Sequence, residues 1–147
     1  MQDQISFSQN RAIRLTLEYK DRQFKVLDRH FLNKRAQSSD LILDKEKDKP
    51  QSGFWIELRD ANERTLYRQV LHNPIPVSVE IHTDDKKNPI RRESNPNPQA
   101  VFGLLFPDLP NAETLVIVSS PLKADAMFEP AADFARFSLR ELKEGKL

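Results

Sequence analysis

The residues with the clearest potential for chemistry lie close together near the middle of the chain. His82, Asp84 and Asp85 offer an imidazole and two carboxylates, which are donor types that hold Zn²⁺ and other divalent cations. In an extended chain His82 and Asp84 are two positions apart and share a face. A metal site, and with it a metal-dependent hydrolase, is therefore one hypothesis. The spacing matches no metal motif, so we favour a solvated strand end and expect no metal and no cofactor.

A small basic cluster follows in the same segment, where Lys86, Lys87, Arg91 and Arg92 lie. Binding of single-stranded nucleic acid requires such charge interleaved with aromatic rings on which bases stack. No aromatic residue occurs within 83–98. We therefore predict no nucleic-acid binding and interpret the cluster as a solvated or protein-contacting loop.

Two aromatic residues are candidates for ligand contact. Trp55, the single tryptophan, alternates with Phe54 and Ile56, so it lies on the opposite face of an extended run. There it could stack on a carbohydrate or anchor an interface, with Tyr67 completing a small-ligand site. In the alternative that we favour, Trp55 belongs to the core and Phe54 faces outward.

Common catalytic motifs do not occur in the chain. It has three glycines and no cysteine, so neither a phosphate-binding glycine loop nor a thiolate site can be built. No G-x-S-x-G or H-E-x-x-H motif occurs, which removes the commonest hydrolase classes. We predict a protein that is not an enzyme.

The bulk composition indicates one globular domain. A length of 147 residues suits a single core, with residues 1–10 and 143–147 expected to be frayed tails. The 23 basic and 22 acidic side chains nearly balance, so no field draws the chain to nucleic acid or membranes. Neither a signal peptide nor a membrane segment is recognisable. We expect a soluble, cytoplasmic protein.

Alternation of apolar and polar residues predicts strands along most of the chain. Residues 11–19 and 24–32 should pair antiparallel, with a bulge near Asp28 and His30. Residues 53–71 read as a hairpin that turns at 60–63. Further strands are expected at 77–82, 100–106 and 114–119, the last buried on both faces or at the centre of a sheet. A crossover between sheets is expected at 33–52 and a polar loop at 83–98. At 129–142 a C-terminal helix is favoured over a strand.

Seven or so short strands separated by turn signals are typical of an all-β sandwich. Immunoglobulin-like or related Greek-key topology is the common solution at this length. A closed barrel is the alternative, but the long connection at 33–52 fits a change of sheet better.

Two stretches, GFWIELRDANERTLYRQVLHNPI and FPDLPNAETLVIVSSP, resemble segments of an uncharacterised group of bacterial β-sandwich proteins. The resemblance extends over about half of the chain. It implies a sandwich, and it transfers no activity and no catalytic or binding residue.

These observations favour a non-enzymatic protein-binding or assembly module. The contact surfaces would be the segments 33–52 and 83–98 or an exposed sheet edge, and the partner would be another protein or a second copy of the chain. The alternative is a carbohydrate- or small-ligand-binding domain.

Overall fold

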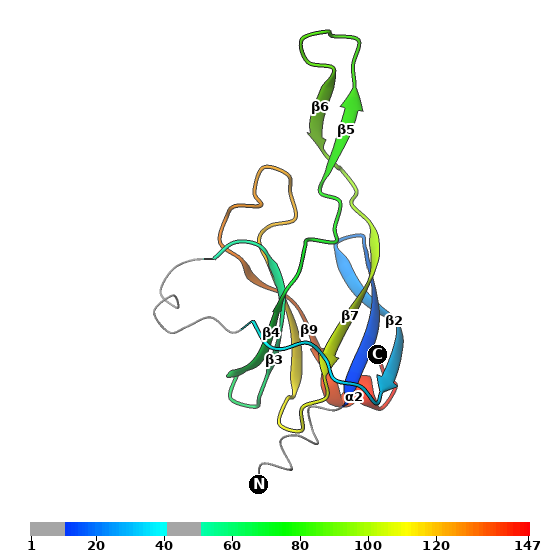
Figure 1. The fold of residues 1–147 in the computed structure, drawn as a ribbon, viewed down its shortest axis with the longest axis vertical. Coiled ribbons are helices and arrows are strands. Elements are labelled where there is room, and N and C mark those ends of the chain that lie inside the picture. Colours follow the sequence, from blue (N-terminus) through cyan, green and yellow to red (C-terminus); the bar gives the residue numbers. More distant parts are fainter. Residues whose placement is uncertain (1–10, 41–50) are drawn as a thin grey trace.

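The computed structural model describes residues 11–40 and 51–147, so the expected frayed start and the charged run at 44–49 lie outside the described residues. The protein is a β-sandwich with a projecting two-stranded ribbon and a short C-terminal helix (Figure 1). Its elements are β1 (Ala12–Lys20), β2 (Gln23–Leu32), β3 (Phe54–Arg59), β4 (Thr65–Val70), β5 (Ser78–His82), β6 (Ile90–Ser94), β7 (Ala100–Pro107), β8 (Thr114–Ser119), β9 (Ala132–Ser138) and α2 (Leu139–Lys143).

The first layer is a three-stranded antiparallel sheet in the order β2-β1-β7. The alternation predicted for the first strand is confirmed, because Ile13, Leu15, Leu17 and Tyr19 are all buried in the main core. Placing β1 at the centre of its sheet satisfies the backbone groups of the strand that supplies most of this apolar face.

The second layer is a four-stranded antiparallel sheet in the order β4-β3-β8-β9. The predicted hairpin is present and supplies two strands of this sheet. β3 pairs with β4, and residues Asp60–Glu63 form the turn between them. The prediction that β8 is buried on both faces is confirmed for Leu115–Ser119. The connection at 33–52 runs from β2 in one sheet to β3 in the other, as the crossover prediction requires.

The predicted bulge in the second strand is present. Thr16 lies opposite Asp28 but Leu17 lies opposite Val26, so Leu27 is an extra residue in β2. A bulge of this kind increases local twist. It also explains why the apolar alternation breaks near Asp28.

The described end of the crossover covers the outer edge of β4. The backbone N–H of Asp40 donates to the carbonyl oxygen of Arg68, and the N–H of Arg68 donates to Ser39 Oγ. The N–H of Val70 donates to Asp40 Oδ2. These bonds satisfy backbone groups that an edge strand would otherwise expose.

The segment 83–98 is not a loop throughout, and this prediction is wrong for part of it. Residues Ile90–Ser94 form β6, which pairs antiparallel with β5. The strand was missed because Ile90 is its one apolar residue, so it has no period of two. β6 is defined by its pairing with β5, since all of its residues are exposed.

A short C-terminal helix is confirmed, but the range 129–142 predicted for it is wrong over most of its length. Residues Ala132–Ser138 form β9, and the helix α2 is limited to Leu139–Lys143. Ile117 lies opposite Ala135 but Val118 lies opposite Asp133, so Phe134 is an extra residue in the strand. Phe134 and Phe137 are three apart in the sequence, which imitates helical periodicity. The bulge lets both rings face the interior, where Phe137 packs against the main core and Phe134 contacts Phe24.

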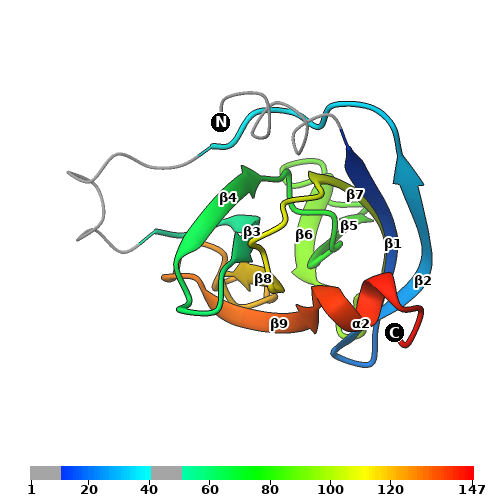
Figure 2. The same cartoon turned by 90° about the horizontal axis from the view of Figure 1, so that it is seen from below.

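Side chains join the two sheets. The Phe54 ring of β3 lies 6.2 Å from that of Phe102 in β7, and the Phe134 ring of β9 lies 5.6 Å from that of Phe24 in β2. The helix α2 closes one end of the core with Leu139 and Leu142, between β9 and the β1–β2 hairpin (Figure 2). Among the described residues no helix has the length and hydropathy that crossing a membrane requires.

Candidate functional site

The most distinctive surface is the ribbon formed by residues 78–94, which we call the arm. Figure 1 shows β5 and β6 extending away from one end of the sandwich, beyond both sheets. No residue of the arm belongs to the described hydrophobic core. An isolated two-stranded hairpin is marginally stable in water, so this element gains little from its own contacts.

The register divides the side chains of the arm between two faces. Val79 and Ile81 lie opposite Glu93 and Arg91 on one face. On the other face His82 lies opposite Ile90. Val79 and Ile90 are among the exposed large apolar residues of the protein. Each strand of the arm has one edge without a partner strand among the described residues, so the arm offers both apolar side chains and backbone groups for contact.

Within the arm the basic residues proposed from the sequence lie among acidic ones. Arg92 Nη2 lies 3.5 Å from Glu80 Oε1, and Arg91 Nη2 lies 2.6 Å from Glu93 Oε1. The residues 78–94 contain four basic and four acidic side chains, the basic ones being Lys86, Lys87, Arg91 and Arg92 and the acidic ones Glu80, Asp84, Asp85 and Glu93. The formal charges of these acidic and basic side chains of the arm therefore sum to zero.

The candidate metal ligands lie at the end of β5 and in the turn of the arm. Asp85 Oδ1 accepts a hydrogen bond from the N–H of Lys87, and the N–H of Asp85 donates to the Thr83 hydroxyl. These bonds shape the turn. Across residues 11–40 and 51–147, no three His, Asp or Glu side chains are grouped so as to hold a metal ion, and His82, Asp84 and Asp85 are not brought together.

Trp55 is buried, with 7% of its surface exposed, but it is not in the main core. It packs with Val116 and Val118 on the outer face of the four-stranded sheet. The expectation that Phe54 faces outward is wrong, since Phe54 is in the main core. The Arg68 guanidinium lies over the indole ring, 4.2 Å from its centroid. Arg68 thus occupies the position that a stacked sugar would take.

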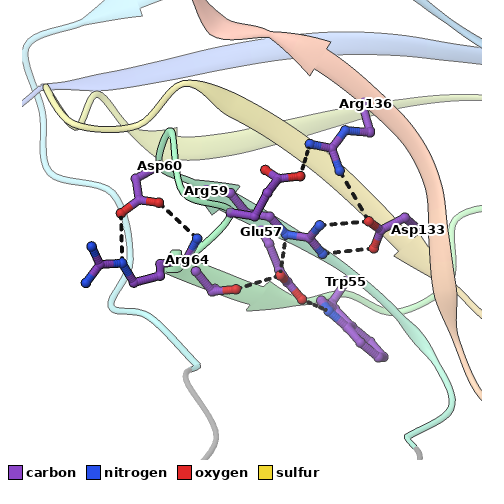
Figure 3. A network of polar contacts seen from close by, with 9 residues as sticks. Trp55, Glu57, Arg59, Asp60, Arg64, Asp133 and Arg136 are labelled. Carbon is purple, nitrogen blue, oxygen red and sulfur yellow. Dashed lines mark hydrogen bonds and ion pairs between the residues drawn. The ribbon is translucent and has the colours of Figure 1, made fainter.

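A polar network extends from Trp55 across this face (Figure 3). Glu57 accepts hydrogen bonds from Trp55 Nε1 at 2.7 Å, Arg59 Nε at 3.0 Å and Thr65 Oγ1 at 2.8 Å. Arg59 also donates two bonds to Asp133, at 2.7 and 2.8 Å. These bonds raise the pKa of Arg59 and lower that of Asp133. The network joins β3, β4 and β9 through the side chains of Glu57, Thr65, Arg59 and Asp133.

Tyr67 is buried as well, so it cannot complete a ligand platform with Trp55. Its hydroxyl donates to the carbonyl oxygen of Gln37 at 3.1 Å. Burial, with a smaller contribution from the charge of Asp40, raises its pKa to about 12. The phenol therefore ties the crossover segment to β4 and is neutral at physiological pH.

The raised pKa of Tyr67 predicts a loss of stability at alkaline pH. An unfolded tyrosine releases its proton near pH 10, whereas the folded form retains it to about 12. The unfolded state then binds fewer protons, so stability falls by about 2 kcal/mol between these values. Chemical denaturation at pH 9 to 12 measures this fall, and Tyr67→Phe should flatten it. If the unfolding free energy falls equally with pH in the parent and in Tyr67→Phe, the raised pKa of Tyr67 is not the cause of the fall.

One exposed aromatic residue was missed by the sequence analysis. Phe128, in the loop between β8 and β9, is 93% exposed. Asn73 Nδ2 lies 3.7 Å from the sulfur of the adjacent Met127. Figure 1 shows this loop at the same end of the sandwich as the arm. A phenylalanine next to Glu129-Pro130, outside any periodic run, is the sequence signal that could have identified it.

Comparisons with protein-family models, with curated proteins and with solved structures give no match.

Proposed function

We propose that this protein is a non-enzymatic binding module that engages another protein through the arm. The observation that supports this proposal is the projection of a ribbon that shares no residue with the core. Keeping such a ribbon ordered costs conformational entropy that its own contacts barely offset. Burial against a partner supplies the missing stabilisation.

The surface chemistry of the arm favours a protein over other partners. Its apolar side chains Val79 and Ile90 are exposed beside ion pairs, a mixture typical of transient protein interfaces. Its free strand edges can extend the sheet of a partner. A second copy of the chain satisfies the same chemistry and is included in this proposal.

The alternative is a carbohydrate-binding domain built on Trp55 and Tyr67. It is less well supported, because both residues are buried. Exposed aromatic faces are what such sites use for stacking.

Removing the arm tests the proposal. Replacing residues 79–93 by Asn-Gly joins the paired residues Ser78 and Ser94 through a two-residue turn. The free energy of unfolding should change by less than about 1 kcal/mol, because no core residue is lost. Partner capture, or self-association seen by light scattering, should be abolished. The measurement compares captured proteins and molar mass for the two chains.

Point variants provide a matched control. Val79→Asp replaces an exposed valine on the face of the arm that also carries Ile81, whereas Val101→Asp replaces an exposed valine of β7. The first should weaken partner binding at least tenfold and the second should leave it unchanged. The proposal is wrong if the shortened chain captures the same partners as the full chain, or if the full chain is monomeric and captures none.

A further inference from the structure

A second candidate site, independent of the proposed function of the arm, is a cleft at the base of the arm. Its volume is about 680 Å³. Three segments form its walls, namely the β1–β2 turn, residues 95–98 and residues 121–123. They come from distant parts of the sequence, which explains why no local motif indicated this site.

One side of the cleft is apolar and aromatic. Phe134, the bulge residue of β9, is 39% exposed and lines the cleft with Pro98 and Pro121. The rings of Tyr19 and Phe134 meet edge-on, with 6.2 Å between their centroids. Rings and prolines of this kind contact apolar groups with little loss of side-chain entropy.

A buried phenol faces the same cleft. Tyr19 lines it although only 3% of the residue is exposed. Its hydroxyl makes no hydrogen bond with another described residue, whereas that of Tyr67 has a backbone partner. Burial raises the pKa of Tyr19, and the charge of Arg22 opposes this shift. The neutral phenol is thus available as a hydrogen-bond donor close to a cation.

Two cations border the cleft. Arg22 and Lys123 both line it and form no ion pair with another described residue. Among the lining residues that the structure describes, Asp21 is the one carboxylate, so their ionised groups leave a single net positive charge. This balance suits a monoanion better than a phosphate, and the lining supplies no glycine-rich loop to bind one.

The backbone places Arg22 at the cleft at an energetic cost. Asp21 and Arg22 have φ angles of 52° and 64°, the left-handed region that glycine or asparagine usually occupies. Each such residue costs on the order of 1 kcal/mol. Glycines at these positions would form the same turn without strain, so the turn retains an arginine side chain at the expense of stability.

From this arrangement we infer that the cleft binds a carboxylate attached to an apolar or aromatic group. The carboxylate would lie between Arg22, Lys123 and the Tyr19 hydroxyl, and the apolar group would rest on Phe134 and the prolines. A free carboxylic acid and the C-terminal residue of a polypeptide share this chemistry. Binding is reversible and involves no covalent step.

The test uses the full chain and two probes, 3-phenylpropionate and the peptide Gly-Ser-Gly-Phe. Titrations followed by the NMR signals of the Tyr19 ring should saturate at millimolar concentration or below. The amide of each probe should bind at least tenfold more weakly, because it cannot pair with Arg22 and Lys123. Binding of the acid alone assigns a small molecule, binding of the peptide alone assigns a polypeptide end, and binding of both supports the shared chemistry.

Variants locate the effect in the cleft. Arg22→Gly fits the left-handed turn and should weaken binding at least tenfold while raising the thermal midpoint. Tyr19→Phe keeps the ring and should weaken binding three- to tenfold, followed in this variant by the NMR signals of the Phe134 ring, which also lines the cleft. Arg91→Gln, on the arm, is the control and should bind like the parent chain. The chain shortened at 79–93 should also bind, which separates this site from the proposed function of the arm.

The inference is overturned if neither probe shifts the Tyr19 signals at 10 mM. It is overturned equally if the amides bind as tightly as the acids, or if Arg22→Gly binds as well as the parent chain.

Discussion

The variant Trp55→Ala is expected to lose about 3 to 5 kcal/mol of unfolding free energy, as buried aromatic truncations do. The indole packs on Val116 and Val118 and lies under the guanidinium of Arg68. Its removal also leaves Glu57 without one of its three hydrogen-bond donors. Urea unfolding followed by circular dichroism measures the loss.

Trp55→Phe separates the two contributions of the indole. It keeps a ring for Arg68 to stack on but removes the N–H that Glu57 accepts. We expect it to cost about 1 to 2 kcal/mol. Trp55→Ala could instead keep the unfolding free energy of the parent chain and abolish binding to a glycan array. That result would show that Trp55 is a ligand platform and that its packing against Val116 and Val118 is wrongly assigned.

Phe54→Ala should be destabilising to a similar degree, by about 3 to 5 kcal/mol. The side chain is 1% exposed, and its ring faces that of Phe102 in the opposite sheet. Side chains of this kind hold the two layers together, because within 11–40 and 51–147 no strand of one sheet pairs with a strand of the other. Truncation therefore leaves a cavity between the sheets. Thermal and urea unfolding provide the measurement.

Two further variants test the location of that effect. Phe54→Leu retains much of the volume and should cost clearly less than Phe54→Ala. Phe128→Ala removes an equally large side chain from a position that is 93% exposed and should change stability by less than about 0.5 kcal/mol. Similar losses for Phe54→Ala and Phe128→Ala would show that burial of Phe54 is incorrectly assigned.

Sequence patterns predicted the elements that bury one face. The alternation of Ile13, Leu15, Leu17 and Tyr19 identifies β1, because its buried and exposed faces differ in chemistry. The sequence did not predict β6, since a strand exposed throughout has no such contrast. It mistook β9 for a helix because the bulge at Phe134 changes the period locally.

The candidate sites were less predictable than the fold. The segment 83–98, selected as a contact surface, covers only part of the arm; the strand at 77–82 was predicted, but its pairing with residues 90–94 was not. The cleft depends on the approach of Tyr19, Pro98 and Lys123, which are far apart in the sequence and share no pattern. Side chains that converge only through tertiary structure leave no periodic signal. Trp55 was ambiguous for a related reason, because β3 is buried on both faces.

The separation between arm and core also bears on how this chain can change over time. A substitution in β1 or β8 alters packing that many neighbours share, so replacements there are constrained by folding. A substitution between 79 and 93 meets no such constraint, and a hairpin of different length or composition would join the same paired serines. Descendants of one ancestor could therefore exchange this segment while keeping the same sandwich, and under the proposed function they would differ mainly in what they recognise.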